Sequence, residues 1–362
     1  MMRFLQTKFW AEFKGHHGWK NCPVQVGESR YSVLVRQLNL KIKKISIAYI
    51  PMAPECNEEF MWEGNKLREK LLGLAASIKS KLPENTFCIR FDPAMDFDGT
   101  SKRDEYVNNF ILTNGNCTVK KAKTNVQPPD TTVLSLVNVA GSAANKRSDE
   151  EILSSMKSKW RYNIKLAAKK GVEVKKFDYN TEGFDVAFEN FYDLFQQTSQ
   201  RDGVQFHSKS YYKDLIFLAS NSQNAKDEKI KITLYLAKHE EDYLAGIITL
   251  FYGNSEAVYL YGASGNIKRN LMPAYLLQWT AIQDAKDFGC TSYDFYGMPP
   301  TDNENHPMHG LYLFKTGFGG KHIHRPGSFD VILNRTDYRL YSLAENMRAF
   351  FYKVLVKKLH GR

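Results

Sequence analysis

Residues Gly310–Gly320 read GLYLFKTGFGG and follow a loop rich in proline and histidine, Pro299–His309. The stretch predicts a short helical turn carrying Phe314 and Lys315, and then a tight turn at residues 317–320. Glycines at such a turn let backbone approach a ligand closely, and a lysine there suits an anion or a carbonyl oxygen. Taken alone, however, the stretch is better explained by an amphipathic turn with a solvated lysine.

The chain carries a surplus of positive charge. Lysine and arginine number 50 against 39 aspartates and glutamates, and the resulting charge of +11 favours an anionic partner. Nucleic acid, a nucleotide-linked sugar and an anionic membrane face all fit that description. The length of 362 residues exceeds one comfortable core and predicts two domains.

The five cysteines are odd in number and form no Cys-x-x-Cys pair, so reduced intracellular thiols are expected. The amino terminus lacks an apolar run of signal-peptide length. No window approaches the ~18 uncharged apolar residues of a membrane span. We therefore expect a soluble, cytoplasmic protein.

Strand and helix periodicities alternate along the chain and predict an α/β (α+β) fold. The first half contains the expected helices Phe4–Lys14 and Glu58–Lys81 and the expected strands Ser32–Leu40, Lys44–Ile50, Phe87–Phe91 and Thr131–Val137. The second half contains the expected helices Phe184–Thr198 and Pro273–Phe288 and the strands Val172–Lys176, Ile230–Lys238, Tyr243–Tyr252, Glu256–Ala263 and Tyr293–Tyr296. A last helix, Asp337–Lys358, has a wide apolar stripe, for which packing on the first domain is favoured over lying on a membrane surface.

The segment Ser148–Lys170 is strongly basic, with its acids confined to its start. Its cations include Lys159, Arg161, Lys165 and Lys169. A solvated helix face and a phosphate-binding face explain this pattern equally well.

Most catalytic signatures are absent: there is no P-loop, no Gly-x-Ser-x-Gly elbow, no His-Glu-x-x-His motif and no kinase set. Cys290 lacks a recognisable partner and is expected to be a structural thiol. Four histidines gather near the opening stretch without a carboxylate or cysteine at ligand spacing, so no metal and no cofactor are expected: His306, His309, His322 and His324.

Several short motifs, in this order, resemble the FemABX family of non-ribosomal peptidyltransferases. They are Gln6-Thr7-x-x-Trp10-x-x-x-Lys14, Tyr49-x-Pro51-x-x-Pro54, Arg90-Phe91-Asp92-Pro93, Gln127-Pro128, Lys159-x-Arg161-x-x-Ile164, Tyr259-Leu260-Tyr261-Gly262, Tyr293-Asp294-x-x-Gly297, and Gly310–Gly320 followed by Pro326-Gly327-Ser328. The motifs run over nearly the whole chain, and their common order reverses the interpretation of the opening stretch.

The resemblance implies two tandem acyltransferase-like (GNAT) domains. The first would span residues 1–138, completed by residues 329–362, whose helix packs back on it, and the second would span residues 139–328. No charged heptad insertion is present, so the chain resembles the short, arm-free FemX-like members. Family members move an amino acid from aminoacyl-tRNA to an amine on the stem peptide of a peptidoglycan precursor.

The resemblance also implies site residues. Lys14 matches a lysine that contacts the nucleotide diphosphate, and its usual arginine partner falls at His207, with Lys209 as the other candidate. Tyr211 and Tyr261 match substrate-contacting tyrosines, whereas a further family tyrosine is Phe87 here and a frequent glutamate is Ser328. Asp92 matches a carboxylate near the accepting amine, and Phe314 with Lys315 matches the pair nearest the reacting ester.

These roles imply a monomeric, metal-free transferase that takes glycine, alanine or serine from aminoacyl-tRNA. Either UDP-MurNAc-pentapeptide or lipid II would accept it, the latter with a peripheral contact at the inner membrane face. Lys315 would stabilise the developing charge, and either Asp92 or the substrate would take the proton. Two alternatives are an acyl-CoA-dependent N-acyltransferase, against which the glycine-poor turn Ser264–Ala274 speaks, and a non-catalytic RNA-binding protein.

Overall fold

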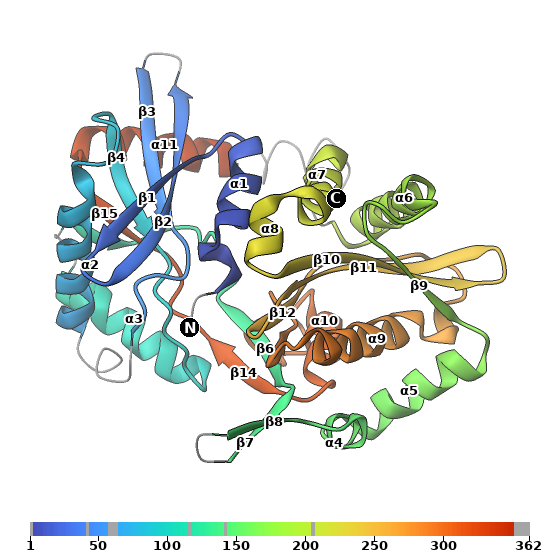
Figure 1. Cartoon of the computed structure of the whole chain (residues 1–362). Helices are drawn as coiled ribbons and strands as arrows, with labels where there is room; N and C mark the ends of the chain where they lie inside the picture. Colours follow the sequence, from blue (N-terminus) through green and yellow to red (C-terminus); the bar gives the residue numbers. More distant parts are fainter. Residues whose placement is uncertain are drawn as a thin grey trace. The chain divides into compact units, whose positions relative to one another are not determined.

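The computed structural model describes residues 3–40, 43–56, 64–114, 118–140, 143–203 and 207–350. The chain forms two compact units, each assembled from separate segments (Figure 1). The smaller unit comprises Lys14–Met95, Asp104–Gln127 and Pro326–Arg362. The larger unit comprises Met1–Phe13, Asp96–Arg103 and Pro128–Arg325. Within the described ranges, no helix is long and apolar enough to cross a membrane.

The smaller unit is built on a six-stranded sheet in the order β1-β2-β3-β4-β15-β5. Its strands are β1 Lys20–Val26, β2 Ser29–Leu40, β3 Lys43–Ile50, β4 Thr86–Phe91, β5 Val119–Lys121 and β15 Phe329–Ile332. β3 and β4 are parallel, and the connection between them contains α2 (Gly64–Lys79). Every residue of β4 is buried, as expected of a strand covered on both faces. Asp92 follows the end of this strand directly.

The last helix, α11 (Arg335–Phe350), packs on this sheet, as the sequence predicted. The Tyr341 ring lies 4.9 Å from that of Phe87, centroid to centroid. On the neighbouring strand β15, Asp330 accepts two hydrogen bonds from the Arg90 guanidinium, at 2.7 and 2.8 Å. The predicted continuation of the helix to Lys358 lies outside the described residues.

The larger unit contains a seven-stranded sheet in the order β14-β6-β13-β12-β11-β10-β9. Its strands are β6 Asp130–Ser135, β9 Glu173–Phe177, β10 Ile230–His239, β11 Asp242–Tyr252, β12 Glu256–Ser264, β13 Ser292–Asp294 and β14 Lys321–His324. α6 (Phe184–Asp202) and α7 (Lys209–Asn221) cover one face, whereas α5 (Ser158–Lys169), α9 (Pro273–Phe288) and α10 (His309–Thr316) lie on the other (Figure 1). α9 connects β12 to β13, which run parallel.

The remaining elements lie between these in the chain. α3 (Thr100–Asn114) precedes β5, α4 (Asp149–Ser154) precedes α5, α8 (Gln223–Asp227) precedes β10, and β7 (Val137–Ala140) pairs with β8 (Ala143–Lys146). The longest described helix is α6 with 19 residues, too short for a projecting coiled-coil arm. The predicted mixed fold without such an arm is therefore confirmed for the part of the chain that is described.

Two elements differ from the expectations. The expected helix Phe4–Lys14 is a 3-10 turn followed by α1 (Lys8–His16), because the Thr7 hydroxyl accepts the Trp10 N–H at 3.1 Å and starts a new helix. The strand β6, expected in a domain ending at residue 138, pairs with β13 and β14 of the seven-stranded sheet. In this part of the chain the division between the units accordingly falls at residues 127/128 and not at 138/139.

Candidate active site

The stretch Gly310–Gly320 forms α10 and a turn, as predicted. Three of its four glycines, Gly317, Gly319 and Gly320, however, lie against protein atoms. A β-carbon on Gly317 would lie 2.2 Å from the Trp160 ring, and one on Gly320 would lie 2.7 Å from the Val133 carbonyl oxygen. Gly320 also has a φ of 101°, which side chains rarely adopt. These glycines are required for close packing in the larger unit.

Lys315 lies on the last turn of α10 and is only 6% exposed. Its Nζ lies 2.6, 3.4 and 2.9 Å from the carbonyl oxygens of Phe295, Tyr296 and Gly297. Burial lowers the pKa of Lys315 to about 7, and the nearby Asp294 carboxylate partly opposes that shift. Because an ammonium has three hydrogens, the charged form of Lys315 is fully used in holding this backbone segment.

Phe314 is half-buried beside Lys315. Its ring meets Tyr275 and Phe318 edge to face, with centroids 5.2 and 5.3 Å apart. Its carbonyl oxygen accepts the Trp160 indole N–H at 2.9 Å. Phe314 is thus held by aromatic packing against α9 and by a hydrogen bond from α5.

Tyr211 on α7 and Tyr261 on β12 come together in the larger unit. The Tyr212 ring lies edge to face with both, at centroid distances of 5.7 and 4.8 Å. A hydrogen bond joins the Tyr211 and Tyr261 phenols, and burial raises the pKa of Tyr211 to about 12. Both phenols are therefore protonated at neutral pH and can donate as well as accept.

The two candidates for the missing family arginine have different surroundings. His207 stacks on Tyr211, with ring centroids 3.9 Å apart and an angle of 21° between the rings. Lys209 forms an ion pair with Glu189 and lies 5.5 Å from the Tyr192 ring centroid. Only His207 of these two contacts the tyrosine that the family resemblance implicates.

Asp92 belongs to the smaller unit and is 5% exposed. Its carboxylate accepts hydrogen bonds from the Tyr49 and Ser328 hydroxyls, and Gln127 donates to the Tyr49 oxygen at 3.1 Å. Burial raises the pKa of Asp92, although both hydroxyl bonds oppose that shift. A carboxylate has about four acceptor positions, and these two hydroxyl bonds use two of them. Ser328, the residue that the resemblance matches to a frequent glutamate, is a hydrogen-bond donor that orients Asp92.

Lys14 also lies in the smaller unit, next to Trp19 and Arg36. Its Nζ is 5.8 Å from the Trp19 ring centroid, and the Arg36 guanidinium carbon is 5.6 Å from the same centroid. Trp19 in turn contacts Tyr49 at 6.1 Å. Burial, and secondly the charge of Arg36, lowers the pKa of Lys14 to about 8. Lys14 and Arg36 thus place two positive charges at one indole ring, close enough for one charge to lower the pKa of the other. Such a pair of cations favours the binding of an anion.

The predicted basic helix is divided into α4 and α5. On α5, Lys159, Lys165 and Lys169 are exposed, whereas Arg161 donates to the Met156 carbonyl oxygen. Tyr162, 62% exposed, lies on the same helix face as the lysines because steps of three and four residues place side chains together.

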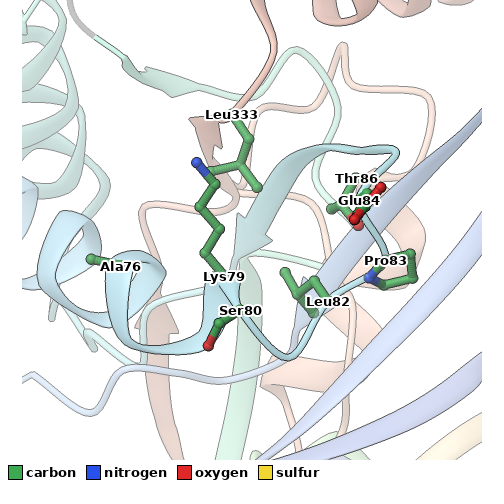
Figure 2. A pocket seen from close by; sticks show the side chains of 8 residues that line it. All are labelled: Ala76, Lys79, Ser80, Leu82, Pro83, Glu84, Thr86 and Leu333. Carbon is green, nitrogen blue, oxygen red and sulfur yellow. The ribbon is translucent and has the colours of Figure 1, made fainter.

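A pocket of about 540 Å³ lies in the smaller unit (Figure 2). Its lining includes Lys79, Glu84 and Thr86 and none of the predicted site residues. Thr86 begins β4 and Asp92 follows its end, so the two lie roughly 20 Å apart at about 3.3 Å per residue. The pocket is therefore separate from the Asp92 network.

The histidines near the opening stretch do not assemble with acids or cysteines into a metal-binding group anywhere in the described ranges. His324 instead pairs with Asp130 at 2.7 Å. Cys290 is buried and its thiol points to the Tyr252 carbonyl oxygen at 3.7 Å, as expected of a structural thiol.

Sequence reasoning did not assign a role to Arg36, Trp19 or Tyr296. Arg36, for example, is an exposed cation on a strand and has no distinctive local sequence pattern. The three residues become recognisable only through neighbours distant in sequence.

Comparison with known proteins identifies the family of the chain. A sequence model of the FemAB family matches residues 1–220 and 218–346. The lipid II:glycine glycyltransferase of Staphylococcus saprophyticus subsp. saprophyticus is 26% identical over 411 residues, covering 98% of this chain and 93% of that protein. The enzyme of the same name from Staphylococcus aureus strain COL is 25% identical over 416 residues, with the same coverage of 98% and 93%.

Solved structures agree in fold. The crystal structure of FemX superposes with a TM-score of 0.68 at 21% identity, covering 93% of this chain and 94% of that one. The C-terminal domain of a putative lysylphosphatidylglycerol synthetase from Agrobacterium fabrum gives a TM-score of 0.50 at 11% identity, covering 96% and 93%. Because the family model covers nearly the whole chain, the chain belongs to the FemAB family.

Proposed function

We propose that this protein transfers an amino acid of the glycine, alanine or serine class from aminoacyl-tRNA to an amine on the stem peptide of a peptidoglycan precursor. The observation that carries this proposal is the end-to-end similarity to lipid II:glycine glycyltransferases. Because aminoacyl-tRNA is the donor, the reaction takes place in the cytoplasm. The enzyme acts as a monomer, with a peripheral contact at the inner membrane face where the acceptor is lipid II.

The reaction needs alignment and charge stabilisation and no covalent intermediate. The acceptor amine attacks the ester carbonyl carbon, an oxyanion forms, and the bond to the ribose oxygen of the terminal adenosine breaks to leave an amide. The amine loses a proton and the departing oxygen gains one. Holding the amine and the ester in line supplies much of the rate enhancement.

Asp92 is proposed to orient the accepting amine and to take its proton. Its carboxylate is oriented by two hydroxyl donors, and burial raises its pKa towards that of a useful base. Substrate-assisted proton transfer is the alternative for this step.

Phe314 and Lys315 are proposed to lie nearest the reacting ester. Lys315 supplies positive charge in a site from which water is excluded, where an ammonium acts more strongly than in bulk solvent. The proximity of its pKa to 7 means that the charge is sensitive to small changes in its surroundings.

Lys14, with Arg36 on the same indole, is proposed to bind the diphosphate of the acceptor. His207, Tyr211 and Tyr261 are also proposed to contact the acceptor. His207 would take the place of the family arginine, because Lys209 is paired with Glu189. The exposed lysines of α5 are proposed to bind tRNA phosphates, together with Arg161.

The test is an assay with purified protein, tRNAs charged with labelled glycine, alanine or serine, and either UDP-MurNAc-pentapeptide or lipid II. Label should move to at least one acceptor. Asp92→Asn should lower kcat by roughly 10²–10⁴-fold, the usual contribution of a positioned base. Asp98→Asn, which changes a carboxylate whose side chain is 59% exposed, is the matched control and should retain activity. Absence of transfer to both acceptors from all three tRNAs would refute the proposed function.

A further inference from the structure

Tyr296 has an unusual backbone conformation. Its φ is +57°, in the left-handed region that is costly for a bulky side chain. Tyr296 follows shortly after β13 and directly precedes Gly297. A glycine in place of Tyr296 would adopt this φ at a lower conformational energy. Such a conformation persists only where neighbouring groups enforce it.

Three side chains hold the Tyr296 backbone. The Asp294 carboxylate accepts its N–H at 2.7 Å, and the Thr131 hydroxyl lies 3.2 Å from its carbonyl oxygen. Thr131 also donates to Asp294 itself. The Lys315 ammonium bonds the carbonyl oxygens on either side of Tyr296, at 2.6 and 2.9 Å.

The flanking chain is equally constrained. The Phe295 N–H donates to the Thr132 carbonyl oxygen and the Met298 N–H to that of Asp130, both at 3.0 Å. A β-carbon on Gly297 would lie 2.9 Å from the Pro128 ring. The segment is therefore fixed from both ends, and its strained residue is a tyrosine whose side chain is half-buried and not part of the hydrophobic core.

The parallel pairing of β12 and β13 places Val258 opposite Asp294, so Tyr261 lies three residues and Tyr296 two residues beyond this pair, on neighbouring segments of the chain. In agreement with this register, burial raises the pKa of Tyr261, and the neighbouring phenols of Tyr211 and Tyr296 raise it further. Three phenols thus gather in the larger unit, beyond the end of β13 and beside its parallel neighbour β12. Ligands of α/β proteins commonly bind at this edge of parallel strands.

We propose that Tyr296 is an acceptor-binding residue, forming with Tyr211 and Tyr261 a set of three phenols that hydrogen-bond oxygen atoms of the acceptor. Lys315 is in addition a positioning residue, because its ammonium holds the backbone that presents Tyr296. This inference rests on the proposed function, since the acceptor is the precursor of that reaction.

The test compares Tyr296→Phe, which removes only the hydroxyl, with Tyr243→Phe, a half-buried tyrosine on β11. Tyr296→Phe should raise KM for the acceptor roughly three- to tenfold, the effect of one hydrogen bond, with a small change in kcat. Tyr243→Phe should change neither. Equal KM values for both variants and the wild type would overturn the role of Tyr296, whereas an inactive wild type would instead refute the proposed function.

The positioning role of Lys315 is tested without turnover. In Lys315→Met, amide hydrogen exchange of residues 295–298 should accelerate relative to the wild type, while exchange in β10 and β11 should be unchanged. Because Lys315→Met can also damage catalysis directly, the double variant with Tyr296→Phe is needed. If Lys315 holds Tyr296 in place, the two effects on KM will not add. Unchanged exchange, or fully additive effects, would refute this part of the proposal.

Discussion

Replacing Gly317 by alanine tests why the opening stretch contains its glycines. The added β-carbon would lie 2.2, 2.4 and 2.6 Å from three atoms of the Trp160 ring. Trp160 cannot move away easily, because its indole N–H is bonded to the Phe314 carbonyl oxygen and its ring packs against Tyr275. Overpacking of this kind costs about 1–3 kcal/mol, and loss of the indole bond would add about 1 kcal/mol.

Gly310→Ala is the matched control, since a β-carbon there meets nothing within 4 Å and Gly310 lies in the first turn of α10. Alanine in place of glycine in a helix stabilises by up to about 1 kcal/mol. Thermal unfolding followed by circular dichroism should therefore show a lower midpoint for Gly317→Ala and an unchanged or higher one for Gly310→Ala. Each kcal/mol corresponds to roughly 2–4 °C for a unit of this size. A Gly317→Ala midpoint equal to that of Gly310→Ala would show that the packing argument is wrong.

Two further predictions concern the cations. The pKa of Lys14 is about 8 in the folded chain and 10.5 in the unfolded chain, so between these pH values folding releases a proton. The free energy of unfolding that Lys14 contributes therefore rises as the pH is raised from about 8 to 10.5. At pH 7, Lys14→Met should therefore have a larger free energy of unfolding than the wild type, and this advantage should be lost by pH 10.5. The control Lys20→Met should show no such pH-dependent advantage. A difference between Lys14→Met and the wild type that stays constant with pH in chemical denaturation would contradict the prediction. The second prediction concerns a variant of α5 with three lysines changed to Gln and Tyr162 changed to Ala; the lysines are Lys159, Lys165 and Lys169. This variant should bind tRNA more weakly. The slope of log K against log salt concentration should fall in magnitude by about one for each phosphate that the variant no longer neutralises. The control changes three exposed lysines elsewhere to Gln: Lys44, Lys81 and Lys231. If the salt dependence of tRNA binding has the same slope in both variants, the lysines of α5 do not bind tRNA and only face solvent.

Most of the residues proposed for the site could be singled out before the fold was known, because they occur in short motifs in a fixed order. Phe314–Lys315, Asp92 and Lys14 each belong to such a motif. Arg36 could not be found in this way, because it acquires significance only when β2 brings it to Trp19. The choice between His207 and Lys209 also depended on neighbours, namely Tyr211 for one and Glu189 for the other.

The sequence by itself determined the alternation of helices and strands, the family, and which side chains are proposed for the site. Periodicity and motif spacing are local properties of the sequence. Only the tertiary structure decided which sheet β6 joins, that Trp160 fills the space beside Gly317, and that the hydrogens of Lys315 point at the backbone of residues 295–297. These outcomes depend on close contacts between segments far apart in the chain. Distances of that kind are set by packing and by the need to bond every buried polar group, and no local pattern encodes them.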